Sequence, residues 1–440
     1  MGTGEGWIAM AENRFWGILP GLWLAAVAVG AWGQVGQDLP PSPDYRGEIR
    51  RGADGRLMVV PAQVQGAAAS AGEVRARATM VVGPGERIAT ITEAARLARD
   101  GEVIEIRPGD YRRQPAVWTQ DNLVIRGGGQ RPVMIGDGAG AGAEGKGIWV
   151  VRGGKVRIEN IEFRGARAPA GGGAGIRLEK GQLTVRRCAF FDDETGLVAG
   201  DSPETALEVA DSEFGSAPAH PGPARHLLLV GEIGSFSLTG SRLYGGNRGA
   251  LVRTGARVSR IYHNMLLDGP EGRAAYELEF PRGGLAFVVG NTIGQSAATG
   301  DPVLVAYGTE GVRWPENGLY LVHNTLTNDG HHGDFLKVWQ DKVPADAEIW
   351  VLNNLTVGQG NLFPPARGRF EGNQSLASRA ELAAVGGIPL RLTNLHPLRG
   401  TIRPPGSARG EDLSPRAEFV FPVGTRPVTL SSSPAPGAFQ

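Results

Sequence analysis

A pattern of eight residues recurs along this chain and constrains its fold more than any other feature. The copies are VRIENIEF (156–163), LTVRRCAF (183–190), LEVADSEF (207–214), FSLTGSRL (236–243), SRIYHNML (259–266), AFVVGNTI (286–293), LYLVHNTL (319–326) and IWVLNNLT (349–356). The third position is always apolar and the first nearly always, which is the alternation of a strand with one buried face. The sixth position breaks this alternation, and the eighth is again a large apolar residue in every copy except the last. We interpret each copy as an inward strand, a tight bend and a second inward strand.

The spacing of the copies predicts a solenoid. Successive sixth positions lie between 23 residues (Ser241 to Asn264) and 33 residues (Asn291 to Asn324) apart, which suits one coil of three short strands. A further set of short apolar segments lies between the copies: GIWVV (147–151), GIRLE (175–179), HLLLV (226–230), ALVRT (250–254), YELEF (276–280), VLVAY (303–307) and FLKVW (335–339). The 68 glycines fit a chain with frequent turns. We therefore predict an all-β fold, a right-handed parallel β-helix.

The sixth position also predicts a stack of buried amides. It holds Asn264, Asn291, Asn324 and Asn354 in the last four copies. Adjacent coils lie about 4.8 Å apart, so these side chains can bond one another and the backbone of the bend. A buried amide without partners would cost roughly 1–3 kcal/mol, which makes a structural ladder the natural interpretation. Cys188 occupies the same position and is interpreted as a small buried apolar residue.

The two ends differ from the repeats. Arg14, the apolar run Phe15 to Val29 and the small-x-small site at Ala31 to Gly33 predict a signal peptide over residues 1–33. The protein is therefore expected to be secreted or periplasmic, without a membrane span after cleavage. Residues 34–78 are expected to be a low-complexity linker and 79–363 the β-helix, with a helix at Glu86 to Arg99 capping its first coil. Residues 364–440 are expected to form an irregular tail that caps and wraps the solenoid.

Three segments resemble a known superfamily. A short helix followed by GEVIEIRPGDY (101–111) and LVIRG (123–127), together with the terminal PGAFQ (436–440), is similar to pectin-lyase-like right-handed β-helix proteins. The resemblance implies this fold over roughly residues 80–440. Polysaccharide lyases, pectinesterases, alginate epimerases and secreted proteins without assigned activity share that fold, so it does not fix the chemistry. No catalytic motif of one of these families is matched residue by residue.

The short apolar segments between the copies form a second set of strands, and their outward-facing side chains are the candidate site. If the even strand positions point inward, Arg177 and Glu179, Arg253, Glu277 and Glu279, and Lys337 with Trp339 share one solvent face, together with Tyr307 if its strand keeps this phase. Aromatic rings stack on sugars and cations pair with uronate carboxylates, so we expect an acidic polysaccharide as partner. The net charge of zero argues against a general nucleic-acid binder, and we expect a monomer.

Glu277 and Glu279 are expected about 6–7 Å apart on one face because they are two residues apart on a strand. Three interpretations stay open. The pair could bind Ca²⁺, it could act as the acid and base of a hydrolase, or it could be an ordinary pair of surface carboxylates. No other cofactor is expected.

The residue types on this face match a lyase or a C5-epimerase of uronates. Either reaction removes the proton next to the carboxyl group and needs a base and a stabilising cation. Lys337, Arg253, Tyr307 and Glu277 are the candidate catalytic residues, and Arg177, Glu179 and Trp339 would bind substrate. The alternative is a non-catalytic carbohydrate-binding or cell-envelope structural protein with the same groove.

Several other polar residues are expected to serve loops and turns. His331 and His332 are expected to lie in a loop at the rim of the groove and contact substrate, with a metal site as the other interpretation. Asp192 to Glu194 are interpreted as an exit turn, and His263 and His323 as residues of the bend. The insert Thr309 to Gly318 is expected to overhang the candidate face.

Overall fold

The computed structural model describes residues 76–138, 142–169, 171–218, 224–300, 302–428 and 432–440. It also describes the backbone of an antiparallel pair of strands, β1 (Gly47–Arg51) and β2 (Leu57–Pro61). All of these residues belong to one compact unit, Pro43–Gln440. The predicted signal peptide and most of the predicted linker lie outside the described residues. In the described part, no helix is long and apolar enough to cross a membrane.

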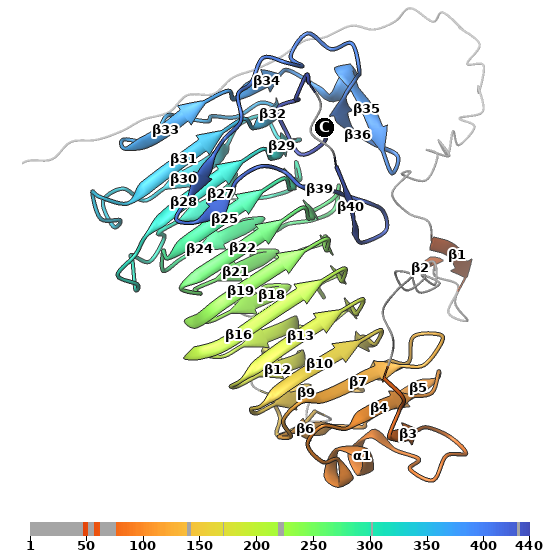
Figure 1. Cartoon of the computed structure of the whole chain (residues 1–440). Helices are drawn as coiled ribbons and strands as arrows, with labels where there is room; N and C mark the ends of the chain where they lie inside the picture. The colour runs from red at the N-terminus through yellow and green to blue at the C-terminus, as the bar shows by residue number, and fades with distance from the viewer. Residues whose placement is uncertain are drawn as a thin grey trace, which may run out of the picture. The chain divides into compact units, whose positions relative to one another are not determined.

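Three parallel sheets form the solenoid (Figure 1). Sheet 1 consists of β3 (Met80–Val82), β4 (Val103–Ile106), β7 (Leu123–Gly127), β10 (Lys155–Glu159), β13 (Gln182–Arg186), β16 (Ser202–Ala210), β19 (Ile233–Thr239), β22 (Val258–Tyr262), β25 (Leu285–Val289), β28 (Gly318–Val322), β31 (Glu348–Leu352) and β33 (Gly368–Glu371). Sheet 2 consists of β5 (Asp110–Arg112), β8 (Val133–Ile135), β11 (Glu162–Arg164), β14 (Ala189–Phe191), β17 (Glu213–Gly215), β20 (Arg242–Leu243), β23 (Met265–Leu267), β26 (Thr292–Gln295), β29 (Thr325–Asn328), β32 (Leu355–Gly358) and β34 (Gln374–Leu376). Sheet 3 consists of β6 (Ala116–Trp118), β9 (Gly147–Val151), β12 (Ala174–Leu178), β15 (Thr195–Ala199), β18 (Leu228–Val230), β21 (Val252–Thr254), β24 (Leu278–Phe280), β27 (Val303–Tyr307) and β30 (Asp334–Val338).

The chain visits the sheets in the same order in each complete coil. It runs through a strand of sheet 1, turns into sheet 2, crosses to sheet 3 and returns to sheet 1 one coil further on. Each strand pairs in parallel with its equivalent in the neighbouring coil, as β10 does with β13. The predicted parallel β-helix is therefore confirmed, and its repeat is the eight-residue pattern seen in the sequence.

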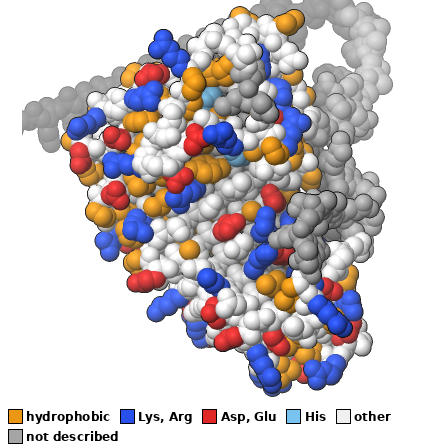
Figure 2. Space-filling view, in the orientation of Figure 1, with side chains coloured by type: hydrophobic (Ala, Val, Ile, Leu, Met, Phe, Trp, Pro, Cys, Tyr) orange, Lys and Arg blue, Asp and Glu red, His pale blue; other side chains and the backbone are white. Residues whose placement is uncertain are grey.

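The solenoid surface carries both signs of charge. The chain has 45 basic and 45 acidic residues, and on the face seen in Figure 2 their side chains are interspersed, without a broad area of one sign. A field strong enough to attract nucleic acid over the whole surface is therefore not built into this face.

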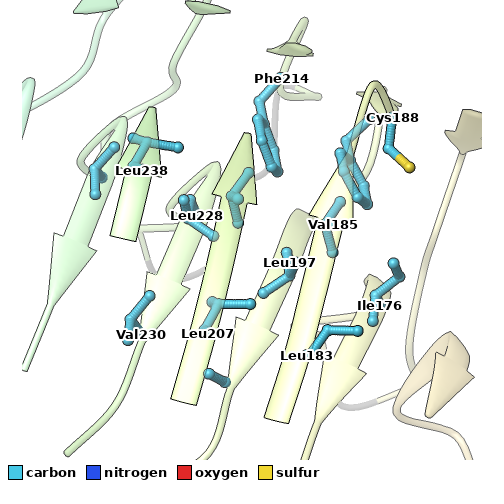
Figure 3. Packing of buried hydrophobic residues seen from close by; sticks show 14 of the residues in the cluster. Ile176, Leu183, Val185, Cys188, Leu197, Leu207, Phe214, Leu228, Val230 and Leu238 are labelled. Atoms are coloured by element: carbon cyan, nitrogen blue, oxygen red, sulfur yellow. The ribbon is translucent and has the colours of Figure 1, made fainter. Parts of the chain in front are cut away.

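The core is a continuous apolar column inside the three sheets. Figure 3 shows side chains of all three sheets, such as Leu207, Phe214 and Leu228, pointing into the shared interior. In the N-terminal half, aromatic rings contact one another along the column: Trp118, Trp149 and Phe163 meet edge to face, and Phe163, Phe190 and Phe214 stack. Apolar burial and ring stacking thus stabilise coils that have no disulfide, since the one cysteine, Cys188, is buried and free.

The amide ladder is present at the predicted bend. Asn264 Nδ2 donates to Asn291 Oδ1 at 3.0 Å, and the same bond links Asn291 to Asn324 and Asn324 to Asn354. Each of these side chains is fully buried, and each acceptor oxygen also receives the backbone N–H of the preceding rung at 2.9 Å. The ladder continues beyond the prediction to Asn373, which accepts from Asn354 Nδ2 at 2.9 Å.

The position before the ladder residue takes the left-handed backbone conformation. His263 has a φ of 55° and His323 a φ of 53°, which confirms that both residues belong to the bend. Burial lowers the pKa of each imidazole to about 4. Neither ring faces the solvent groove that the sequence analysis considered.

The exit turn after β14 also has the predicted role. The Asp193 carboxylate accepts the backbone N–H of Ala166 at 2.7 Å, and Glu194 accepts those of Ala168 and Gly173 at 3.1 and 2.6 Å. Both acids are buried and hold the neighbouring coil's turn.

The two ends of the solenoid differ in detail from the prediction. Helix α1 (Ile91–Leu97) is shorter than the expected span 86–99 because Thr90 caps it, with its side chain accepting the N–H of Glu93 at 3.2 Å. At the other end, β33 and β34 extend sheets 1 and 2 to Leu376, past the expected boundary at residue 363.

The tail that follows wraps the solenoid. It contains the 3₁₀ turn η1 (Arg379–Glu381) and three antiparallel pairs: β35 (Leu382–Val385) with β36 (Ile388–Leu392), β37 (Ser407–Ala408) with β38 (Glu411–Asp412), and β39 (Ala417–Phe419) with β40 (Thr425–Pro427). Ala408 and Leu413 pack on Phe287 and Tyr320 of sheet 1. Phe419 and Phe439 form an apolar cluster with Met265 of sheet 2 and with Ile388 and Leu390 of β36. The tail therefore covers outward positions of sheets 1 and 2 in the C-terminal half.

Candidate functional site

One outward column of sheet 3 carries four of the ten candidate residues. The strand registers align, coil by coil, Arg177, Val198, Leu229, Arg253, Glu279, Ala306 and Lys337. We call these residues the sheet 3 column. Glu179 lies two residues after Arg177, and Trp339 lies two residues after Lys337, at the same edge of the sheet. The structure thus brings Arg253, Glu279 and Lys337 onto one face, while Arg177 lies three coils before Arg253.

Arg253 is held between two carboxylates. Its Nη1 lies 2.6 Å from Oε1 of Glu279, the next residue of the column, and its Nη2 lies 2.6 Å from Oε1 of Glu310. The hydroxyl of Thr309 also donates to Glu279 Oε1 at 2.8 Å. The insert 309–318 therefore overhangs the sheet 3 column, as the sequence analysis expected.

These contacts extend into a larger ion-pair network. Arg282 lies 3.4 Å from Glu310 and 3.6 Å from Glu232, and Arg313 lies 2.9 Å from Glu232. With Arg253 and Glu279, the network has three cations and three anions, so its formal charges cancel. An acidic ligand would have to displace a carboxylate in order to pair with Arg253.

Lys337 is placed differently from Arg253. Its side chain is exposed, and Nζ lies 5.1 Å from the centre of the Trp339 ring, which is a cation–π contact. Within the described residues Lys337 has no carboxylate partner. The exposed charge of Lys337 is therefore open to a ligand.

Glu277 does not face solvent, so its predicted place beside Glu279 is wrong. Its side chain is fully buried, between the core residues Leu251 of the preceding coil and Leu304 of the next. Neither carboxylate oxygen has a hydrogen-bond partner within the described structure, and burial raises the pKa of Glu277 well above its usual value. Glu277 lies in the bend through which the chain enters sheet 3, and its side chain points inward. The next residue, Leu278, points inward as well.

The position of Glu277 excludes two interpretations of the Glu277 and Glu279 pair, the Ca²⁺ site and the acid and base of a hydrolase. Glu277 lies in the core and Glu279 on the outer face, so the two carboxylates cannot hold one Ca²⁺ ion or flank one glycosidic bond. Among the described residues, no group of three or more His, Cys, Asp or Glu side chains could hold a metal ion. His331 and His332 therefore belong to no such group.

Tyr307 is also in the core, which corrects its expected place on the candidate face. It is fully buried, and its hydroxyl donates to Gly284 O at 2.7 Å and accepts the N–H of Gly318 at 2.9 Å. Burial raises the pKa of this phenol above its usual value. The strand of Tyr307 has the opposite phase to the expected one, because Val305 and Tyr307 continue the inward positions of Leu278 and Phe280.

The remaining candidates lie apart from Arg253. Glu179 pairs with Lys146 at 2.5 Å and Arg152 at 2.9 Å, and the hydrogen bond from Lys146 lowers the pKa of Glu179. His331 and His332 are exposed in the loop that leads into β30, the strand of Lys337. This places the two histidines at the edge of sheet 3, as expected.

A basic edge beside sheet 3 was missed in the sequence analysis. Arg225 and Arg248 are aligned in adjacent coils, and the N–H of Arg248 donates to Arg273 O at 2.8 Å. The sequence does contain a signal for this edge. Each of the three arginines comes one to three residues before one of the apolar segments 226–230, 250–254 and 276–280. His226 joins this edge to the column: burial, then the charges of Arg253 and Arg225, lower its pKa to about 4.

Comparisons with known proteins find likeness of structure only. No protein-family model and no curated protein matches the chain. A pectate lyase, Pel9A, is similar with a TM-score of 0.46 and 12% identity, over 83% of this chain and 97% of that one. The PL6 family polysaccharide lyase Pedsa3628 from Pseudopedobacter saltans is similar with a TM-score of 0.35 and 13% identity, over 69% and 94% of the two chains. At these values the comparisons carry no information about activity. The coil architecture itself confirms the prediction of a parallel β-helix.

Proposed function

We propose that the protein binds an acidic polysaccharide along the outward face of sheet 3. The observation that carries this proposal is the exposed Lys337 over Trp339, in register with Arg253 on one column. An ammonium group beside an indole ring offers a charge for a uronate carboxylate and an apolar surface for a sugar ring.

The position of the tail supports sheet 3 over the other two sheets. Ala408 and Leu413 of the tail pack on Phe287 and Tyr320 of sheet 1, and Phe419 and Phe439 pack against Met265 of sheet 2. A chain laid along either of these faces in the C-terminal half would meet the tail.

The basic edge supports an acidic ligand over a neutral one. Arg248 and Arg273 are exposed, and Arg225 is partly exposed, so three guanidinium groups border sheet 3 in three successive coils. Coils are about 4.8 Å apart, so a polymer with regularly spaced carboxylates would meet these cations repeatedly.

A uronate lyase or C5-epimerase is the second candidate function, and Lys337 is the residue that favours it. A lysine without a carboxylate partner can serve as the base that removes the proton next to a uronate carboxyl. The second cation of the predicted set, Arg253, lies three coils away, about 14 Å at the usual strand spacing, and is paired with Glu279 and Glu310. Binding is therefore the function that the geometry supports best.

The test is affinity electrophoresis with alginate, polygalacturonate, a glycosaminoglycan and a neutral glucan. We expect retardation by one or more of the acidic polymers, and a loss of about tenfold in affinity, equal to about 1.4 kcal/mol, in Lys337→Ala. Lys155→Ala is the matched control, because Lys155 is an exposed lysine on sheet 1. Equal retardation of Lys337→Ala and wild type, or retardation by the neutral glucan alone, would contradict the proposal. Ultraviolet absorbance from an unsaturated uronate would assign the lyase function instead.

A further inference from the structure

The C-terminal end of the solenoid contains a pocket that is separate from sheet 3. Its volume is about 310 Å³, within the range of small-molecule sites. The solenoid contributes Leu352, Asn353, Arg369, Glu371 and Gly372, and the tail contributes Thr401, Ile402, Arg403, Pro404 and Pro405. The pocket thus forms where the tail crosses the last strands of sheet 1.

Hydrogen bonds fix both walls of this pocket. Asn353 Nδ2 donates to Arg403 O at 2.8 Å, and Arg369 Nη1 donates to Pro405 O at 3.2 Å. The Arg369 guanidinium also lies 4.8 Å from the centre of the Trp350 ring. Because the tail is tied to the solenoid on both sides, the pocket exists before any ligand enters.

The charges of the pocket leave one cation available. Arg369 pairs with both oxygens of Glu371, at 3.0 and 3.1 Å, which cancels one positive and one negative charge. Arg403 is exposed and has no ion pair within the described residues, and it acts on Glu371 only through its charge. The pocket therefore has one guanidinium group whose planar fork fits a carboxylate.

The remaining lining suits a sugar ring. The side-chain oxygens of Glu371, Asn353 and Thr401 can accept hydrogen bonds from sugar hydroxyls, and Pro404 with Leu352 supplies apolar surface for ring C–H groups. We propose that this pocket binds a single uronate residue, with its carboxylate on Arg403 and its hydroxyls on Glu371 and Asn353. Such a residue can be a free uronic acid or the end of a chain, and both present the same chemistry.

Methyl NMR spectroscopy can test this site locally in the full-length protein. Ile402 lines the pocket and is buried, so its δ1 methyl signal, assigned with Ile402→Val, reports binding there. We expect D-galacturonate or D-mannuronate to shift this signal saturably and to leave that of Ile88, at the other end of the solenoid, unchanged. Galactose, without the carboxylate, and acetate, without the ring, are expected to bind at least tenfold more weakly. If neither uronate shifts Ile402, or if acetate matches them, the inference is wrong.

Variants separate this pocket from the sheet 3 site. Arg403→Ala is expected to weaken uronate binding at least tenfold, while Arg416→Ala, an exposed tail arginine paired with Asp412, leaves it unchanged. Lys337→Ala is also expected to leave it unchanged, so a failure of the sheet 3 proposal would not remove this site. Equal affinities of Arg403→Ala and Arg416→Ala would contradict the assignment. A uronate oligosaccharide with free ends that shifts Ile402 more strongly than the monomer would identify a chain end as the natural ligand, and a weaker shift would identify the free acid.

Discussion

Replacing Glu277 by glutamine is expected to stabilise the protein more and more as the pH rises. The Glu277 carboxyl lies among core residues, without a hydrogen-bond partner in the described structure, and Asp268 is the ionisable neighbour that acts on it. Burial, followed by the charge of Asp268, raises the pKa of Glu277 well above the 4.5 of an unperturbed glutamate. At pH values between its unfolded and its folded pKa, Glu277 therefore keeps in the folded protein a proton that the unfolded chain has lost.

The magnitude follows from this difference in bound protons. Between the unfolded pKa and the folded pKa, stability falls by about 1.4 kcal/mol for each pH unit because unfolding releases one proton. Burial also raises the pKa of Asp268, to about 6, so both acids contribute below that pH. Asp268 and Asp193, whose pKa burial also raises, are present in both proteins, so the difference between the two proteins reports mainly Glu277. The free energy of unfolding of Glu277→Gln should therefore gain on wild type by about 1.4 kcal/mol for each pH unit above 4.5, up to the folded pKa of Glu277.

Equilibrium unfolding in urea, followed by the fluorescence of the buried Trp118 and Trp149, measures this difference. The glutamine side chain does not ionise, so the free-energy cost of burying its amide is the same at every pH. This cost therefore does not affect how the stability difference changes with pH. Glu279→Gln is the control: it removes the partner of Arg253 and is expected to destabilise the fold. Parallel pH profiles for wild type and Glu277→Gln would refute the reasoning, since they would mean that Glu277 ionises as easily in the folded protein as in the unfolded one.

Three further changes test the fold. Asn291→Leu should lower the free energy of unfolding by about 2–5 kcal/mol, because it leaves the buried partners of two ladder rungs unpaired, and thermal unfolding would show no change if the ladder were incidental. Tyr307→Phe should cost about 1–3 kcal/mol in the same assay, since Gly284 O and Gly318 N–H lose their partner, and an unchanged Tm would contradict the buried role of its hydroxyl. Glu411→Gln should loosen the tail, whose Glu411 lies 2.6 Å from Arg260 of sheet 1, so limited proteolysis should cut the tail faster; unchanged cleavage would argue against this anchor.

The sequence was a good guide wherever neighbouring coils repeat the same residue. Asn264, Asn291 and Asn324 could be placed because each stands at the same phase between apolar positions. Asn373 escaped notice because its copy of the pattern, GRFEGNQS (368–375), begins with glycine and ends with serine, so two of its three apolar markers are missing.

The candidate face was harder to predict, for a physical reason. Alternation assigns faces only when its phase is known, and the inward bend at the entrance of sheet 3 shifts that phase. Glu277 was therefore placed on the wrong side, and so was Tyr307. Ion pairs such as Arg253 with Glu310 join residues 57 positions apart and depend on how a loop folds over the sheet, which no local pattern reports.

Protection of lysines from chemical modification tests the central proposal most directly. The protein is treated with an amine-reactive reagent, with and without a saturating acidic polysaccharide from the panel, and each lysine is quantified by mass spectrometry. Slower modification of Lys337 in the presence of polysaccharide, with Lys155 on sheet 1 modified at an unchanged rate, is the predicted result. Protection of Lys155 with Lys337 still fully reactive would place the ligand on another face and contradict binding at sheet 3.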